Sequence, residues 1–212
     1  MKSQSATTYG IEERWNAYSH GFGILLSLIG LLFWLNHFQG RSLEFKSGII
    51  IYSASLILLF TASTVYHAVD DARTKRKLRV LDHISIYYLI AGTYTPVCLL
   101  ALQESKGSLL LIIVWGMALF GTLLKLFFTG KFEVFSLLLY AFMGWSIVID
   151  FNFLKEVLSS SGLFYLGLGG AFYTVGILFY AIRKIPYNHL IWHFFVLGGA
   201  ISHWIMIYKE MF

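Results

Sequence analysis

The chain has 212 residues, of which 58% are hydrophobic and only 13% are charged, and its formal net charge is +5. Soluble domains carry about 25% charged residues, and the mean hydropathy here is +0.70. These values exclude an ordinary soluble domain and indicate an integral membrane protein.

Seven apolar stretches follow one another along the chain, and each reaches the roughly 20 residues that a bilayer-spanning helix needs. They cover residues 15–37, 47–69, 80–102, 107–128, 132–154, 162–182 and 189–208. Continuous apolar runs are typical of helices, whereas membrane barrels show short alternating segments. No Pro-rich or Ser-rich linker separates the stretches. We therefore predict an all-α protein, with one seven-helix transmembrane domain that covers residues 1–212.

The first apolar stretch follows a polar amino-terminal segment. It is too long for the core of a signal peptide and lacks a small-residue cleavage pattern, so we expect it to remain as the first helix. At its entrance Glu12, Asn16 and His20 recur every four residues, with Glu13 beside them. Residues four apart share a helix face. This polar stripe is therefore expected to face the interior of the bundle or to line a cavity.

The end of the second stretch and the start of the third carry further polar residues. Ser63 precedes His67 by one helical turn on the same face, and Asp82 opens the third stretch. The Ser63 hydroxyl either bonds the backbone four residues earlier, polarises a metal-bound water or donates a hydrogen bond to a substrate carbonyl. The single cysteine, Cys98, lies inside the third stretch. It has no partner for an internal disulfide, and we interpret it as a core residue.

The last stretch begins with two histidines four residues apart, His189 and His193. Ionisable side chains are costly inside a membrane and are therefore usually functional, and this spacing puts both imidazoles on one helix face. Leu190 stands where the zinc protease motif requires glutamate. Haem ligation by His189 and His203 is disfavoured because no partner helix carries a matching pair. His203 lies about 21 Å deeper along the helix, and we assign it packing or a hydrogen bond.

Lysine and arginine residues are unevenly divided between the two ends of the predicted helices. Eleven of the sixteen fall at the end that holds the amino terminus, and five fall at the other end. Cytoplasmic loops hold the excess of positive charge. We therefore predict a cytoplasmic amino terminus and an external carboxyl terminus, in the cell (inner) membrane. The same rule explains the basic segment 70–79, so the positive charge needs no nucleic acid as partner.

This orientation puts four polar residues at one membrane level near the cytoplasmic side: His67, Asp82, His189 and His193. Three imidazoles and a water molecule are the ligands of a catalytic zinc ion. Asp82 would hold that water and act as general base, because a bound cation lowers the pKa of water from about 15.7 toward about 7. We predict a Zn²⁺ site on this basis. The alternative is that the four side chains only form hydrogen bonds between helices.

The chain resembles the hemolysin III family, within the progestin and adipoQ receptor group and its relatives among alkaline ceramidases, from about Glu12 to the carboxyl end. The motifs that carry the resemblance are the EE-x-x-N-x-x-x-H entrance (Glu12, Glu13, Asn16, His20), S-x-x-x-H (Ser63, His67), the pair Asp82-His83 and H-x-x-x-H (His189, His193). The resemblance implies zinc bound by His67, His189 and His193. It also implies that Asp82 and Ser63 lie close to the metal-bound water.

Two functions of different classes follow. In the first, the protein hydrolyses a ceramide-like lipid amide: zinc hydroxide helped by Asp82 attacks the amide carbonyl, and Ser63 stabilises the oxyanion. Its partners are then membrane lipids and a lipid substrate. In the second, the protein is a cytolytic, pore-forming or membrane-homeostasis component whose metal is structural or sensory. Segments 109–124 and 162–181 carry no charge, which disfavours a wide aqueous pore within one subunit.

Overall fold

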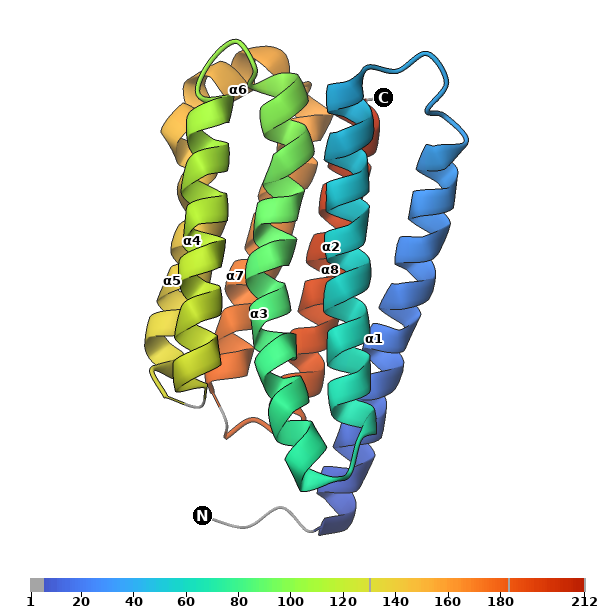
Figure 1. Ribbon diagram of the computed structural model, residues 1–212, viewed down its shortest axis with the longest axis vertical. Coiled ribbons are helices and arrows are strands. Elements are labelled where there is room, and N and C mark those ends of the chain that lie inside the picture. The colour runs from blue at the N-terminus through green and yellow to red at the C-terminus, as the bar shows by residue number, and fades with distance from the viewer. Residues whose placement is uncertain (1–5, 130, 183, 212) are drawn as a thin grey trace.

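The computed structural model describes residues 6–129, 131–182 and 184–211, and every regular element in these residues is a helix (Figure 1). In chain order the elements are α1 (Ala6–Leu35), α2 (Leu43–Ala68), α3 (Ala72–Pro96), the π-helical turn η1 (Val97–Ala101), α4 (Gly107–Phe128), α5 (Glu133–Trp145), the 3₁₀ turn η2 (Ser146–Asp150), α6 (Phe151–Val157), α7 (Ser160–Ala181) and α8 (Asn188–Met211). The predicted all-α fold is confirmed.

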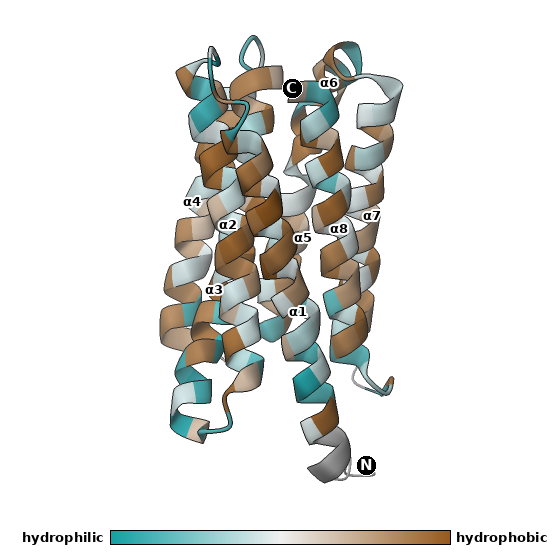
Figure 2. Cartoon of the chain, turned by 90° about the vertical axis from the view of Figure 1, so that its right-hand side faces the viewer, coloured by the Kyte–Doolittle hydropathy of each residue, from teal (hydrophilic) through white to brown (hydrophobic). Residues whose placement is uncertain are grey.

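Seven helical segments within the described residues are long and apolar enough to cross a membrane. Two of them join several elements, because α3 continues into η1, and α5 continues through η2 into α6. Figure 2 shows apolar residues along the middle of the helices and polar residues concentrated toward both ends. This distribution matches a hydrocarbon core between two polar interfaces, and the chain is a multi-pass membrane protein.

Helix α3 begins earlier than its apolar stretch. It starts at Ala72, so the basic segment 70–79 is mostly helical and Asp82 lies ten residues inside α3, not at its start. Asp71 caps the helix by accepting a hydrogen bond from the Thr74 backbone N–H at 2.8 Å. The hydrogen bonds from Thr74 hold the pKa of Asp71 below its ordinary value. Lysine and arginine are good helix formers, so the helix extends beyond the part that hydropathy detects.

The first and last helices also extend beyond the predicted stretches, α1 at its start and α8 at its end. Helix α1 begins at Ala6, so the polar amino-terminal segment is helical from that residue on. Helix α8 continues to Met211. Helices α2 and α7 are capped by Ser42 and Ser159, whose hydroxyl oxygens accept backbone N–H groups of the first turn. Hydropathy therefore identified the spans correctly, but several observed helices extend beyond the ends that it predicted.

The fifth span is not the continuous helix that the apolar stretch 132–154 predicts, because it tightens into η2 between α5 and α6. Asp150, the last residue of η2, is buried. Its carboxylate accepts hydrogen bonds from the Ser105 hydroxyl and the Lys106 backbone N–H, both at 2.9 Å. A buried carboxylate requires such partners. The loop before α4 thus holds the turn in place, which is a contact that hydropathy does not reveal.

Helices α2 and α3 form the centre of the bundle. The buried share of the membrane-spanning window is 56% for both, compared with 17% for α7. The two helices approach closely at Gly92, where a Cβ atom would lie 2.2 Å from the Ser55 hydroxyl oxygen. Small residues permit such close contact between membrane helices. Helix α8 packs mainly against α7 and also contacts α1.

A partly buried ionic cluster joins α3, α4 and α5. Lys125 is only 1% exposed, and its ammonium group lies 3.3 Å from the Glu133 carboxylate. Arg79 contacts the same carboxylate at 3.1 Å, and His83 Nδ1 lies 4.0 Å from it. Charges inside a membrane protein pair with one another because isolated charges are expensive there. This cluster therefore fixes the position of α3 relative to α4 and α5.

The bundle has two distinct ends. Helices α1, α3 and α8 begin at one end, and α8 finishes at the other end (Figure 1). Among the eleven basic residues counted for the first end, Lys2 and Arg183 lie outside the described residues. Which end faces the cytoplasm remains a prediction.

Cys98 is a buried free cysteine, in agreement with its interpretation as a core residue.

Candidate metal centre

Three histidines from two helices meet at the end of the bundle where α8 begins. His67 lies in the last turn of α2, and His189 and His193 lie in the first two turns of α8. One ring nitrogen of each lies within 4.8 Å of the other two. The Nε2 atoms of His67 and His189 are 3.2 Å apart. The fold thus assembles a histidine cluster that could hold a metal ion.

The Glu13 carboxylate supports His67 from α1. His67 Nδ1 lies 3.3 Å from Glu13 Oε2, and because an ionised carboxylate only accepts hydrogen bonds, Nδ1 carries the hydrogen. The same carboxylate oxygen contacts the Lys75 ammonium group from α3. Nε2 of His67 is therefore the nitrogen with the free lone pair. Metal-binding histidines typically show this arrangement, in which the second ring nitrogen donates to a carboxylate.

The backbone of α1 supports His193 in a similar way. His193 Nδ1 lies 3.2 Å from the Asn16 carbonyl oxygen and 3.0 Å from the Ser19 hydroxyl oxygen. A carbonyl oxygen only accepts, so the contact with Asn16 is a hydrogen bond when Nδ1 carries the hydrogen, and Nε2 is then left for a ligand bond. Sequence reasoning missed Ser19. Its position three residues after Asn16, on the face of the polar stripe, is the signal that could have found it.

Two other residues of the polar stripe contact α8. The His20 ring stacks on the His193 ring, with centroids 3.6 Å apart and planes at 10°. Neither ring nitrogen of His20 has a hydrogen-bond partner in the part of the chain that the structure describes. Glu12 is buried, and its carboxylate lies against the backbone N–H groups of His189 and Leu190. The N-terminus of a helix favours negative charge, so Glu12 stabilises the start of α8.

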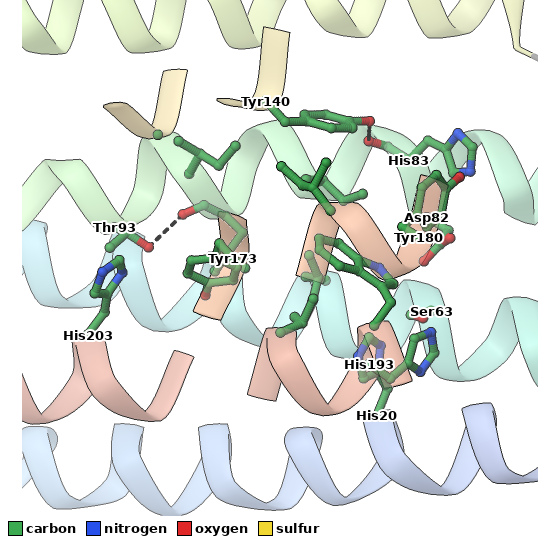
Figure 3. A pocket seen from close by; sticks show the side chains of 18 of the residues that line it. His20, Ser63, Asp82, His83, Thr93, Tyr140, Tyr173, Tyr180, His193 and His203 are labelled. Atoms are coloured by element: carbon green, nitrogen blue, oxygen red, sulfur yellow. Dashed lines mark hydrogen bonds between the residues drawn. The ribbon is translucent and has the colours of Figure 1, made fainter. Parts of the chain in front are cut away.

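Ser63 and Asp82 lie on the wall of a cavity that also includes His189 and His193 (Figure 3). Both side chains are buried. Ser63 comes from α2 and Asp82 from α3. The histidine cluster therefore borders a cavity that also contains a hydroxyl and a carboxylate. These groups can donate a hydrogen bond to a bound molecule or accept a proton from it.

One pair of the three imidazoles has the spacing of neighbouring ligands in a tetrahedral metal site, and all three ligand nitrogens lie within 4.8 Å of one another. With Zn–N distances of about 2.0–2.1 Å, a tetrahedral site places neighbouring nitrogens about 3.4 Å apart, and the His67 and His189 nitrogens are 3.2 Å apart. The outer hydrogen bonds of His67 and His193 leave one lone-pair nitrogen on each ring. Imidazole nitrogens suit zinc, copper, iron or nickel better than magnesium or calcium.

His203 makes the hydrogen bond that the sequence analysis assigned to it, and it also has a second place in the structure. It does make a hydrogen bond, because its Nε2 lies 3.3 Å from the Leu166 carbonyl oxygen. However, it also lines the same cavity as His193, and Figure 3 shows it at the opposite end. Tyr173 of α7 lies beside it. No sequence signal pointed to Tyr173, since the packing of α7 against α8 decides where its side chain lies.

Comparison with known proteins supplies the family. A family model described as haemolysin-III related matches residues 9–204. The chain belongs to this family. The match spans all ten candidate site residues that the sequence analysis named, from Glu12 to His203.

Relatives of this haemolysin-III-related protein occur in bacteria and in animals. The Hemolysin-3 homolog of Bacillus subtilis (strain 168) is 43% identical over 195 residues, which cover 90% of each chain. Hemolysin-3 of Bacillus cereus is 38% identical over 202 residues, or 94% of this chain and 91% of the relative. The monocyte to macrophage differentiation factor of Homo sapiens is 31% identical over 208 residues, or 93% and 83%. No solved structure matches the chain. The predicted family and its place in the progestin and adipoQ receptor group are confirmed.

Proposed function

We propose that this haemolysin-III-related protein is a zinc-dependent hydrolase of ceramide-like lipid amides. The observation that carries the proposal is the histidine cluster, with ring nitrogens within 4.8 Å of one another, beside the buried Asp82 carboxylate in one cavity. Structural zinc sites are normally closed by four protein ligands, whereas catalytic sites have three and keep one position open. A set of three imidazoles therefore favours a catalytic ion.

Asp82 is the residue that would move a proton. A bound zinc ion would supply Lewis-acid polarisation and would lower the pKa of water toward about 7. The group of residues whose ligand atoms lie within 4.8 Å of one another contains the three histidines and not Asp82, so we treat its carboxylate as separate from the ligand set. It would accept a proton from the attacking water and return it to the leaving amine. Proton transfer by a positioned side chain contributes about 10²–10⁴-fold to the rate.

Ser63 and the apolar walls of the cavity would bind the substrate. The Ser63 hydroxyl would donate a hydrogen bond to the amide oxygen, where negative charge develops during attack. Beyond the polar residues the cavity is lined by apolar side chains such as Leu59, Ile86 and Val196. These walls would bury an acyl chain and exclude water from the reacting groups. A lipid amide satisfies both requirements, since it joins a polar carbonyl to a long chain.

We place the histidine cluster near the cytoplasmic side of the membrane. The support is the charge distribution, since the sequence assigns eleven of sixteen lysine and arginine residues to this end and nine of these eleven lie in the described residues, together with the rule that cytoplasmic ends hold the positive excess. Lys75 and Arg79 belong to this excess, and each forms an ion pair with a glutamate at this end. This placement would give the polar products direct access to the cytoplasmic interface.

The test measures metal content and turnover in the same preparations. Wild type, His193→Ala and Asp82→Ala are purified, zinc is quantified per chain, and fatty acid release from ceramide and related N-acyl lipids is followed. We expect about one zinc per chain in wild type and Asp82→Ala, because the three ligands remain. We expect little zinc and no turnover in His193→Ala. Asp82→Ala should lose about 10²–10⁴-fold in turnover.

His37→Ala and Asp70→Ala serve as matched controls. Both residues are exposed and neither lines the cavity, so both variants should retain the zinc content and turnover of wild type. Wild-type protein without zinc after mild purification would contradict the metal site. Stoichiometric zinc without turnover of any lipid amide would contradict the hydrolase.

The second candidate function is a cytolytic, pore-forming or membrane-homeostasis role with a structural or sensory metal. The names of two bacterial relatives, Hemolysin-3 and the Hemolysin-3 homolog, favour it. A pore through one subunit requires polar residues along whole helices, and segments 109–124 and 162–181 carry no charge. Zinc binding without turnover is the result that this function predicts.

A further inference from the structure

The cavity beside the histidine cluster has a second polar end. Its lining includes His193 and also His203, ten residues further along α8. A rise of 1.5 Å per residue puts them about 15 Å apart along the helix. Figure 3 shows His203 with Thr93 of α3 and Tyr173 of α7 away from the histidine cluster. We call these three residues the far end of the cavity, and the histidine cluster its near end.

Apolar side chains separate the two polar ends. The cavity lining between them includes Leu89, Ile90, Ile177 and Val196. The separation of about 15 Å is half of the hydrocarbon thickness of about 30 Å, and therefore close to the depth of one leaflet. This length and this apolar lining are what one extended lipid chain requires of a binding site. A polar group at the far end would then meet the distal part of that chain.

His203 presents an unused hydrogen-bond acceptor at the far end. Its Nε2 lies 3.3 Å from the Leu166 carbonyl oxygen, and because a carbonyl only accepts, Nε2 carries the hydrogen. In the neutral imidazole the other nitrogen, Nδ1, then has the lone pair. Nδ1 is buried and has no hydrogen-bond partner among the described residues. Leaving a buried acceptor unpaired is costly, and because His203 lines the cavity, an occupant that donates a hydrogen bond to Nδ1 would remove this cost.

Helix α7 fixes the direction of this acceptor. Gly169 packs directly against the His203 ring, and a Cβ atom at that position would lie 2.2 Å from Cδ2 and 2.3 Å from Nε2. The Tyr173 ring lies nearby, with its centroid 5.6 Å from that of His203. The imidazole is therefore held between the backbone of α7 and a neighbouring ring. It has little freedom to rotate toward another partner.

The neighbouring threonine does not supply the missing donor. The Thr93 hydroxyl donates to the Leu89 carbonyl oxygen at 2.7 Å, so its oxygen is left with acceptor capacity only. His203 Nδ1 and Thr93 Oγ1 are thus two acceptors on one end of the cavity. A hydroxyl group on the occupant matches this set because it can donate. A carbonyl or carboxylate does not match these two acceptors, since neither has a hydrogen to donate to them.

We propose that the far end recognises a hydroxyl group on the chain of a lipid whose carbonyl lies at the near end. This inference rests on the proposed function, which puts the reactive carbonyl beside the histidine cluster. The favoured ligand is a long-chain amphiphile with a hydroxyl about one leaflet depth from its head, rather than the same chain without it. His203 is then a specificity-determining residue and takes no part in the chemical step.

The test compares two fatty acids that differ in one hydroxyl, dodecanoate and ω-hydroxydodecanoate. Fatty acids are the class of product that amide hydrolysis releases, and this chain has about the required length. Calorimetric titration of the zinc-loaded protein in detergent should show about three- to tenfold tighter binding of the hydroxy acid, the change that one net hydrogen bond contributes. A purely apolar cavity would prefer dodecanoate instead, so the direction of the preference is diagnostic.

Three variants separate the role of His203 from general packing. His203→Phe keeps a ring but removes the acceptor, and should reverse the preference while retaining zinc. His203→Gln keeps both an acceptor and a donor, and should retain part of the preference. His37→Phe alters an exposed histidine that does not line the cavity, and should behave as wild type.

Equal affinity for the two acids in wild type would overturn the inference, because water alone would then satisfy His203. A preference that survives in His203→Phe would also overturn it. The same titrations separate failure of the far-end site from failure of the proposed function. Zinc and dodecanoate bound without preference would leave that function intact and refute only the far-end site. Loss of both zinc and fatty acid binding in wild type would refute both.

Discussion

The near end and the far end of the cavity hold their histidines in different ways. At the near end, His67 and His193 each have an outer partner supplied by α1, namely the Glu13 carboxylate and the Asn16 carbonyl. At the far end, His203 has one hydrogen bond to a backbone carbonyl, and its ring packs against a glycine of α7. The histidines of the near end thus belong to a network of hydrogen bonds, whereas the histidine of the far end has one hydrogen bond.

This difference corresponds to two kinds of recognition. A metal site tolerates ligand errors of only about 0.2 Å, so its imidazoles need outer hydrogen bonds that orient each ring. Selection between two lipid chains needs only one hydrogen bond that is made with one chain and not with the other. The polar stripe of α1 therefore belongs to the near end. Rigid packing against α7 is sufficient for the far end.

Metal removal should distinguish the two ends most strongly. An ion that binds only the folded protein stabilises it by about 4 kcal/mol at 1,000 times its Kd, and here it would join α2 to α8. Chelation should therefore lower the Tm of wild type, and added zinc should restore it. His203→Phe should show the same shift as wild type, whereas His67→Ala should show almost none. A wild-type Tm that does not respond to chelation would contradict the metal at the near end.

Glu13→Gln tests whether the outer partner of His67 matters. The amide keeps an acceptor but loses the charge that faces His67 and Lys75. Loss of such an outer partner typically weakens metal binding by 10–100-fold, which a competition titration with a chromogenic chelator would measure. The matched control is Lys75→Met, which leaves the contact between Glu13 and His67 in place and should weaken binding much less. Equal effects of the two changes would assign the loss to the ion pair instead.

Gly169→Ala should give the smallest effect, confined to the far end. The new Cβ atom would lie 2.2 Å from the His203 ring, so the ring must shift and lose its hydrogen bond to Leu166. We expect the preference for the hydroxy acid to disappear, with unchanged zinc affinity and a loss of about 1 kcal/mol in stability. Gly167→Ala and Gly170→Ala are controls on the same helix, since a Cβ atom there meets nothing within 4 Å. If these controls also abolish the preference, the effect does not depend on His203.

Much of the molecule could be predicted from the sequence because the determining physics is local. The thickness of the bilayer sets the length of each apolar stretch, and the helical repeat puts His189 and His193 on one face. The helix ends were less accurate. Asp82 was expected at the start of the third helix, yet α3 begins at Ala72, because helix formation continues outside the apolar part. The turn at η2 was missed because it depends on contacts of Asp150 with a distant loop.

The sequence by itself determined an all-helical membrane protein, the family to which it belongs and the residues that could bind a metal. Only the tertiary structure decided that Ser19 contacts His193 and that His203 shares a cavity with the histidine cluster. The reason is that lipid tails are as apolar as the core of the bundle. Hydropathy therefore reveals that a helix lies in the membrane, but it does not determine how the helix is rotated about its axis. Packing between helices makes that choice.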